Sequence, residues 1–208
     1  APANIHWCEF VVQPHAYSPH IGEFWNTVSN AVYVVAGFGG LVRDVKQDLP
    51  AAFAFTDVTL MAVGAGSALF HSTQTLAGEL LDELPMCVLA AGYLGCTYRL
   101  HWLTSTPHSS WFFPFMLILP VIALALYLQS GIHELFTTIF TLQVAAPALI
   151  SLFTGPFTTF SAARKGWWAF IITVSVAKVL WEYERWLFQR NRCPTSEYDW
   201  RFWLHGYW

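Results

Sequence analysis

Long apolar runs separated by short polar connectors dominate the pattern of this chain. A helix needs about 20 mainly apolar residues to cross a bilayer. Six runs of that kind predict membrane-spanning helices, at 24–43, 51–72, 80–99, 111–129, 132–153 and 167–187. We expect a seventh span to begin near Trp200 and to be truncated in this chain. The pattern therefore predicts an all-α integral membrane protein, a seven-transmembrane helical bundle whose last helix is truncated.

Composition agrees with this prediction. Of the 208 residues, 55% are hydrophobic and 11% are charged, whereas soluble domains average about 25% charged residues. The net charge of −3 rests on few charged residues and says nothing about nucleic acid, and because no basic stripe suggests such a partner, we expect none. We divide the chain into an N-terminal segment, 1–23, and a helical membrane domain, 24–208.

The positions of Lys and Arg favour one orientation of the bundle, because positively charged loops tend to face the cytosol. If the N-terminus is lumenal, the cytosolic loops contain Arg43, Lys46, Arg99, Arg164 and Lys165. Arginines that follow the sixth span run against the rule, namely Arg185, Arg190, Arg192 and Arg201. The balance predicts a lumenal N-terminus.

The four cysteines fall into two groups. Cys87 and Cys96 lie inside apolar runs, which is typical of packing thiols. Cys8 and Cys193 lie in polar flanking segments that share the lumenal side in the predicted orientation. A disulfide can form between them in an oxidising compartment, and two unpaired thiols are the alternative.

Three polar residues at membrane depth form the candidate site. Ser67 and His71 are four residues apart, so they share one face of a helix. Asp82 follows a short turn, and we place it in the first turn of the third span. A charge at the bilayer centre costs about 2.5 to 17 kcal/mol, so such groups are usually functional. Each residue alone has a structural explanation, since the helix dipole favours an early acid and a histidine can simply pack. Together they favour a functional site.

A zinc enzyme typically uses three protein ligands and keeps one position open for water. His71 is one candidate ligand, and His205, at the start of the last apparent span, is a second. No third nitrogen donor stands out within the chain. In the N-terminal segment, Glu9 and Glu23 are either solvated or, with backbone carbonyls, form a weak calcium site.

Four sequence blocks resemble the alkaline ceramidases, seven-span members of a membrane hydrolase superfamily that also includes the adiponectin-type receptors. These blocks are Trp7-Cys8-Glu9, Glu23-Phe-Trp-Asn-Thr-Val-Ser-Asn30, Gly66-Ser67…Phe70-His71 and Leu81-Asp-Glu-Leu-Pro-Met86. The resemblance implies a zinc-dependent amidase that hydrolyses the N-acyl bond of ceramide to sphingosine and a fatty acid. It also implies a membrane of the endoplasmic reticulum or Golgi, with ceramide or a related sphingolipid and membrane lipids as partners.

The resemblance assigns roles to individual residues. His71 corresponds to the first zinc ligand, and His205 to the first member of a His-x-x-x-His pair whose second member falls just beyond Trp208. Ser67 and Asp82 correspond to the family's catalytic serine and aspartate.

A family calcium site is matched in part, by Trp7, Glu9 and Glu23, while His6 stands where the family has aspartate. Zn²⁺ is thus the expected cofactor and Ca²⁺ a further candidate. Cys8 matches a disulfide cysteine of the family, and Cys193 lies near the position of its partner.

The implied chemistry is coherent. Zinc lowers the pKa of bound water to about 7, Asp82 would act as general acid and base, and Ser67 would donate a hydrogen bond to the oxyanion. Two other functions stay open at this point. The first is a catalytically compromised lipid-binding or receptor-like protein of the same superfamily, and the second is a structural membrane subunit. The oligomeric state is undetermined by sequence.

Overall fold

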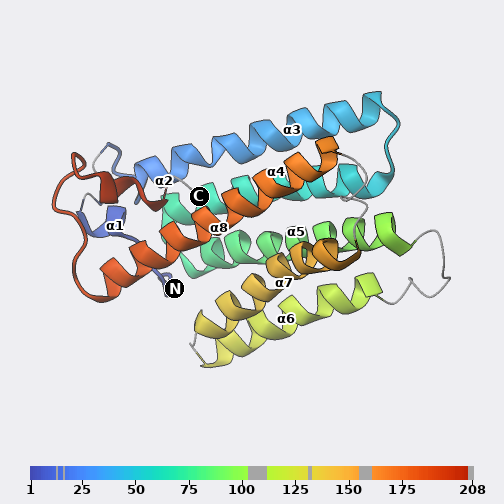
Figure 1. Ribbon diagram of the computed structural model, residues 1–208. Helices are drawn as coiled ribbons and strands as arrows, with labels where there is room; N and C mark the ends of the chain where they lie inside the picture. Colours follow the sequence, from blue (N-terminus) through green and yellow to red (C-terminus); the bar gives the residue numbers. More distant parts are fainter. Residues whose placement is uncertain (13, 16, 103–111, 131–132, 155–160, 206–208) are drawn as a thin grey trace.

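The computed structural model describes residues 1–12, 14–15, 17–102, 112–130, 133–154 and 161–205 (Figure 1). Within these ranges the chain forms helices and no strand, apart from one isolated bridge between Pro2 and Thr75. The helices are α1 (Cys8–Val12), α2 (Phe24–Ser29), α3 (Ala31–Lys46), α4 (Ala51–Thr73), α5 (Leu76–Trp102), α6 (Phe112–Ser130), α7 (His133–Thr154), α8 (Ser161–Gln189) and the 3-10 helix η2 (Trp200–Trp203). The all-α prediction is confirmed for the described residues.

Each predicted span coincides with helix, but membrane crossing is supported less broadly. The first span is divided at Asn30 into α2 and α3. Where a seventh span was expected, the structure has only η2 within the part of the chain that it describes. Among the described residues, α4 is the one helix long and apolar enough to cross a membrane. Seven membrane crossings therefore stay a prediction.

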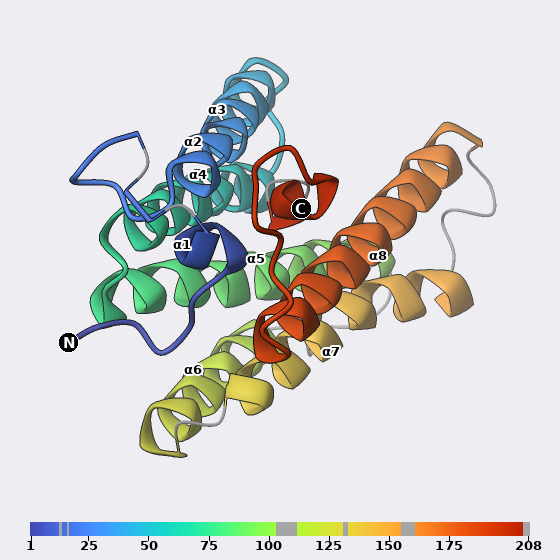
Figure 2. The same ribbon diagram turned by 90° about the vertical axis from the view of Figure 1, so that its left-hand side faces the viewer.

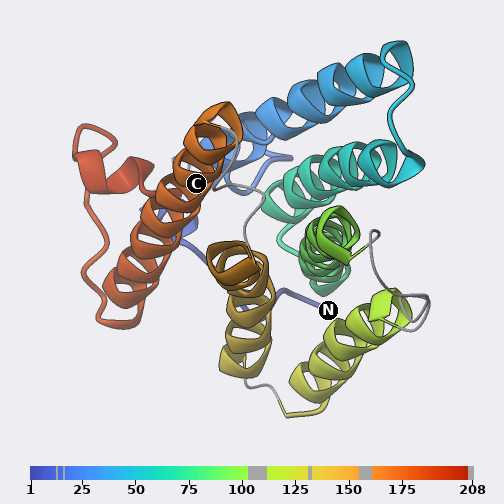
Figure 3. The ribbon, with the colours of Figure 1, turned by 45° about the vertical axis from the view of Figure 1, so that its right-hand side comes forward.

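The hairpin of α4 and α5 brings the predicted catalytic residues together. Pro50 precedes the first turn of α4, where a missing N–H costs no helical hydrogen bond. The helix ends where Gln74 adopts a left-handed conformation (φ 50°) and donates its N–H to the carbonyl of Phe70. After this single tight turn, α5 turns back and packs against α4 (Figure 1), and Figure 3 shows that the two helices cross at an angle.

The predicted start of the third span was wrong by several residues. The helix begins at Leu76, so Asp82 lies in its second turn, and the acidic residue of the first turn is Glu79. Gly78, which precedes Asp82 by four residues, lies within the helix. A Cβ at this position would come within 2.8 Å of the Cα of Phe70, so glycine is needed here for close packing. The helix dipole, which acts mainly in the first turn, therefore does not explain Asp82.

The first residues of the chain are fastened across the α4–α5 turn. The N–H of Ala3 donates to the carbonyl of Gln74 (3.0 Å). Next along the chain, the N–H of Asn4 donates to the carboxylate of Glu79 (2.7 Å), and the amide of Asn4 donates to the hydroxyl of Tyr127 on α6 (3.2 Å). These bonds hold α1 at the end of the bundle where α4 ends and α5 begins, as seen in Figure 2.

The predicted disulfide between Cys8 and Cys193 is confirmed. It ties α1 to the segment that follows α8, and Cys8 also packs with Leu187 of α8 and Leu204 in a buried apolar cluster. As a result α1, α2, the end of α8 and the C-terminal segment gather at one end of the molecule (Figures 1 and 2). The candidate site lies at this end.

Candidate metal centre and active site

Two histidines that are distant in sequence face each other at this end of the bundle. His71 lies in the last turn of α4, and His205 follows η2. Their Nε2 atoms are 3.1 Å apart although 134 positions separate them in the chain. Both side chains are buried. The structure therefore brings together the two zinc ligands predicted from the sequence.

Each imidazole is held from behind by a buried carboxylate. The Nδ1 of His71 is bonded to Oε2 of Glu23, and the Nδ1 of His205 lies 3.2 Å from Oε2 of Glu184. Both glutamates are fully buried. Metal-ligating histidines usually donate their second ring N–H to a carboxylate or carbonyl, which fixes the tautomer and the ring orientation. The arrangement matches that pattern on both sides.

The hydrogen-bond chemistry of this pair suits a cation. If both carboxylates are ionised they can only accept, so that the Nδ1 of each ring carries the proton and the Nε2 of a neutral ring is an acceptor. The Nε2 lone pairs of His71 and His205 consequently converge on the same space. Two acceptors at 3.1 Å repel each other unless a proton or a metal ion lies between them. Nitrogen donors of this type are suited to Zn²⁺.

The described residues supply two candidate nitrogen ligands and not a full set. Within them, no group of three or more His, Cys, Asp or Glu side chains is arranged to hold a metal ion. The third ligand expected from the sequence, a histidine just beyond Trp208, lies outside the described residues, which end at His205.

Ser67 and Asp82 lie close to His71. Ser67 is buried one turn before His71 on α4, and the carboxylate of Asp82 on α5 interacts electrostatically with both side chains. Gly66 makes this approach possible, because a Cβ there would lie 2.6 Å from the carbonyl carbon of Leu81 and 3.2 Å from the backbone nitrogen of Asp82. A hydroxyl, an imidazole and a carboxylate thus share one site.

The three predicted calcium residues lie at the same end of the molecule but make different contacts. The carboxylate of Glu9 accepts the backbone N–H groups of Trp25 (2.7 Å) and Asn26 (2.8 Å), in the first turn of α2. Glu23 accepts from the amide of Asn26 (2.9 Å) as well as from His71. The ring of Trp7 lies against that of His205, with centroids 4.2 Å apart. The calcium prediction for Trp7, Glu9 and Glu23 stays a prediction, while Glu23 has a clear contact with a zinc-ligand candidate.

The electrostatic environments of the two acids differ. Burial raises the pKa of Glu9 above its usual value, although its two backbone donors act in the opposite direction. Burial would also raise the pKa of Glu23, but the charge and hydrogen bond of His71 outweigh it, so that pKa lies below its usual range. Glu23 is therefore the acid held as a carboxylate beside the histidine pair.

Sequence reasoning missed the roles of Glu23 and Glu184 as partners of the imidazoles. For Glu184 a signal was present, because it is an acidic residue inside an apolar span predicted at 167–187. Glu182 gives the same signal two residues earlier, so the pattern alone does not say which acid faces the site.

The fold and the site define a helical protein with a buried, carboxylate-supported pair of histidines. Over residues 1–208 the chain matches the family model described as Ceramidase, and it belongs to that family.

Individual relatives agree with this assignment. The protein named "Alkaline ceramidase" from Arabidopsis thaliana is 27% identical over 186 residues, which are 88% of this chain and 69% of that protein. "Alkaline ceramidase 3" from Mus musculus is 30% identical over 97 residues, 47% of this chain and 35% of the mouse protein. "Alkaline ceramidase YPC1" from Saccharomyces cerevisiae is 36% identical over 84 residues, 40% of this chain and 26% of the yeast protein. The chain thus spans about a third of the mouse protein's length. The family predicted from the four sequence blocks is confirmed.

Proposed function

We propose that this protein hydrolyses the N-acyl amide bond of ceramide to sphingosine and a free fatty acid, with Zn²⁺ as cofactor. Membership of the ceramidase family supports the reaction class. The observation that carries the proposal is the 3.1 Å approach of the Nε2 atoms of His71 and His205, with a carboxylate behind each ring. His71 and His205 would hold the metal, together with the histidine expected beyond Trp208.

When bound, zinc would act as a Lewis acid and lower the pKa of a water molecule to about 7. The residues of this chain supply the proton transfers and the orientation. A carboxylate oxygen of Asp82 would take the proton of the attacking water and then deliver it to the nitrogen of the leaving amine, as a general base and acid must. Its electrostatic interaction with His71 supports this role.

Ser67 has two successive roles in this proposal. Its hydroxyl hydrogen serves one acceptor at a time, and in this proposal the first acceptor is the carboxylate of Asp82, with which Ser67 interacts. That bond orients the carboxylate before the reaction. Once Asp82 has gained a proton it is a weaker acceptor, and the hydroxyl of Ser67 can turn to the developing oxyanion of the substrate, where such a donor lowers the barrier.

The proposed substrate has long apolar chains, and several features of the protein suit a membrane in which such chains dissolve. Helix α4 is long and apolar enough to cross a bilayer and carries both Ser67 and His71. Large apolar side chains are also exposed on several other helices, among them Val32, Val35, Phe38, Ile118, Val121, Val176 and Val179. We propose that they contact lipid and that hydrolysis takes place within the membrane of the endoplasmic reticulum or Golgi, with the N-terminus lumenal.

The proposal is tested with purified protein in detergent, ceramides of varied chain length, and mass spectrometry of the products. Zinc content is measured by elemental analysis. Turnover should require zinc and should disappear in His71→Ala and Asp82→Ala, whereas His20→Ala, at an exposed histidine, should retain it. Retained turnover in either site variant would refute the mechanism. Ceramide binding without zinc and without turnover would instead identify a lipid-binding member of the superfamily.

A further inference from the structure

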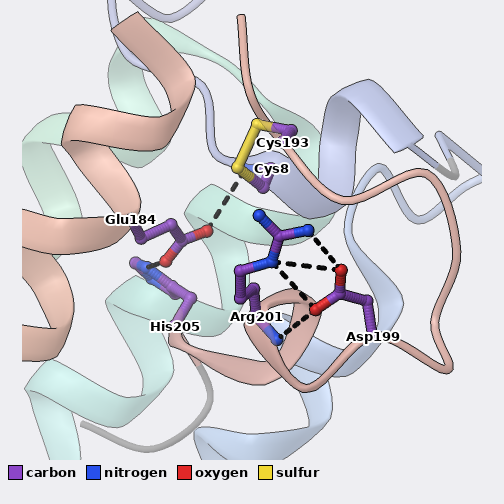
Figure 4. Close-up of a disulfide and its surroundings, with 6 residues drawn as sticks. All are labelled: Cys8, Glu184, Cys193, Asp199, Arg201 and His205. Carbon is purple, nitrogen blue, oxygen red and sulfur yellow. Dashed lines mark hydrogen bonds and ion pairs between the residues drawn. A yellow bond between two sulfur atoms is a disulfide. The ribbon is translucent and has the colours of Figure 1, made fainter. Parts of the chain in front are cut away.

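One carboxylate, that of Glu184, connects three segments of the chain at the candidate site. It lies on α8 and is fully buried. Its Oε2 is 3.2 Å from the Nδ1 of His205 in the C-terminal segment, and its Oε1 accepts the backbone N–H of Cys8 in α1, also at 3.2 Å. Figure 4 shows both contacts, with the disulfide of Cys8 and Cys193 beside them.

The burial of this acid calls for an explanation. A buried carboxylate costs free energy unless it is paired and hydrogen-bonded. Two residues earlier on the same helix, Glu182 is exposed and forms an ordinary surface ion pair with Lys178 (2.8 Å). Glu184 instead points inward, and each of its oxygens has one nitrogen partner, the backbone N of Cys8 and the Nδ1 of His205. Its contacts are those of a group that fixes another side chain.

We propose that Glu184 is a positioning residue: its carboxylate fixes the tautomer and the plane of the His205 imidazole for zinc binding. This inference rests on the proposed zinc-dependent function. By accepting a hydrogen bond from Nδ1–H, the carboxylate leaves the Nε2 lone pair of His205 directed at His71. The N–H of Cys8 holds the other oxygen, and the disulfide fixes Cys8 to the segment that leads to His205.

Packing alone does not supply this function. Trp7 lies against the ring of His205, and Leu204 is buried next to it in the chain. At η2, Asp199 accepts the N–H of Arg201 and pairs with its guanidinium. These contacts place the C-terminal segment. However, an apolar contact does not distinguish a ring protonated at Nδ1 from one protonated at Nε2, whereas a carboxylate acceptor does.

The isosteric change Glu184→Gln tests the inference because an amide cannot replace the carboxylate here. The N–H of Cys8 is a donor to Glu184, and in the proposed tautomer the Nδ1–H of His205 is a second donor. Glutamine has one acceptor oxygen and one donor NH₂. If its oxygen faces Cys8, its NH₂ faces Nδ1 and favours the tautomer with Nε2 protonated, which cannot bind metal. If the amide is flipped, two donors meet at Cys8.

The experiment measures zinc affinity of the full chain by competition with a chromophoric chelator, alongside ceramide turnover and the melting temperature of the metal-free protein. Loss of a carboxylate that supports a metal-ligating histidine typically costs about 10- to 100-fold in metal affinity or activity. We expect a loss of that size in Glu184→Gln with little change in metal-free melting. Glu184→Asp, which keeps the carboxylate, should recover part of it. Glu182→Gln is the matched control and should bind zinc as the wild type does.

Each result has a defined meaning. Wild-type zinc affinity in Glu184→Gln would overturn the inference and leave the proposed function intact. Equal losses in the Gln and Asp variants, each with a lowered metal-free melting temperature, would make Glu184 a packing residue and also overturn it. A wild-type protein that binds no zinc would refute the proposed function and this role with it. If Glu184→Gln does not fold, ¹⁵N NMR of the metal-free wild type decides, since a proton on Nε2 of His205 instead of Nδ1 contradicts the inference.

Discussion

The close approach of α4 and α5 at Gly66 offers a sharp test of how the site is built. Gly66 directly precedes Ser67, and it faces the backbone of Leu81 and Asp82 on the neighbouring helix. We consider the change Gly66→Ala, which adds one methyl group and removes no polar atom. In an isolated helix this substitution is favourable by about 1 kcal/mol. Any loss of stability must therefore come from packing between the helices.

The size of the disturbance follows from the structure. The new Cβ would lie 2.6 Å from the carbonyl carbon of Leu81 and closer still to its oxygen, while ordinary van der Waals contact begins at 3.4 Å. The two backbones must separate by at least the difference, about 0.8 Å, because neither contacting group is a flexible side chain. Overpacking of this kind costs about 1 to 3 kcal/mol. A shift near 1 Å between catalytic groups can reduce the rate about 100-fold.

The assay compares Gly66→Ala with Gly39→Ala. Gly39 lies on α3, and a Cβ added there meets nothing within 4 Å. We expect Gly66→Ala to lower the melting temperature and to reduce ceramide turnover by about 100-fold, as the contact between Ser67 and Asp82 is pulled apart. Gly39→Ala should keep turnover and keep or raise the melting temperature. Wild-type turnover and melting in Gly66→Ala would refute the close packing of α4 on α5 as the source of the site's geometry.

Three further predictions concern the site and its supports. Ser67→Ala should reduce turnover about 10²- to 10³-fold through loss of one oxyanion donor, with zinc content unchanged; a parallel loss of zinc by elemental analysis would show instead that Ser67 supports the metal. Removal of zinc by a chelator should lower the melting temperature, because the facing Nε2 atoms of His71 and His205 are then left without a cation. Added Zn²⁺ should restore the melting temperature and added Mg²⁺ should not. Equal restoration by Mg²⁺ would argue against nitrogen ligands. Replacing Cys8 and Cys193 together by serine should lower the free energy of unfolding by about 2 to 5 kcal/mol, measured by denaturant titration against the oxidised wild type. An unchanged midpoint would mean that the disulfide does not stabilise this end of the bundle.

Much of the helical framework could be predicted from the sequence, because it depends on local order. The apolar runs are long, and Pro50 precedes the helix that begins at Ala51. The four-residue spacing of Ser67 and His71 likewise fixes their common face. The start of α5 could not be predicted in this way. Gly78 is an ordinary turn signal in sequence, and only its contact with Phe70 shows that it is a packing glycine inside a helix.

The tertiary structure alone decided which distant groups meet. His71 and His205 had been singled out as ligand candidates, yet their 3.1 Å approach depends on how α4, α8 and the C-terminal segment pack. The same holds for Glu182 and Glu184, acids two residues apart on one helix, of which one is exposed and the other lies behind His205. Residues two apart point in different directions from a helix. The packing of the neighbouring helices determines which direction faces the site, and a local sequence pattern does not predict that packing.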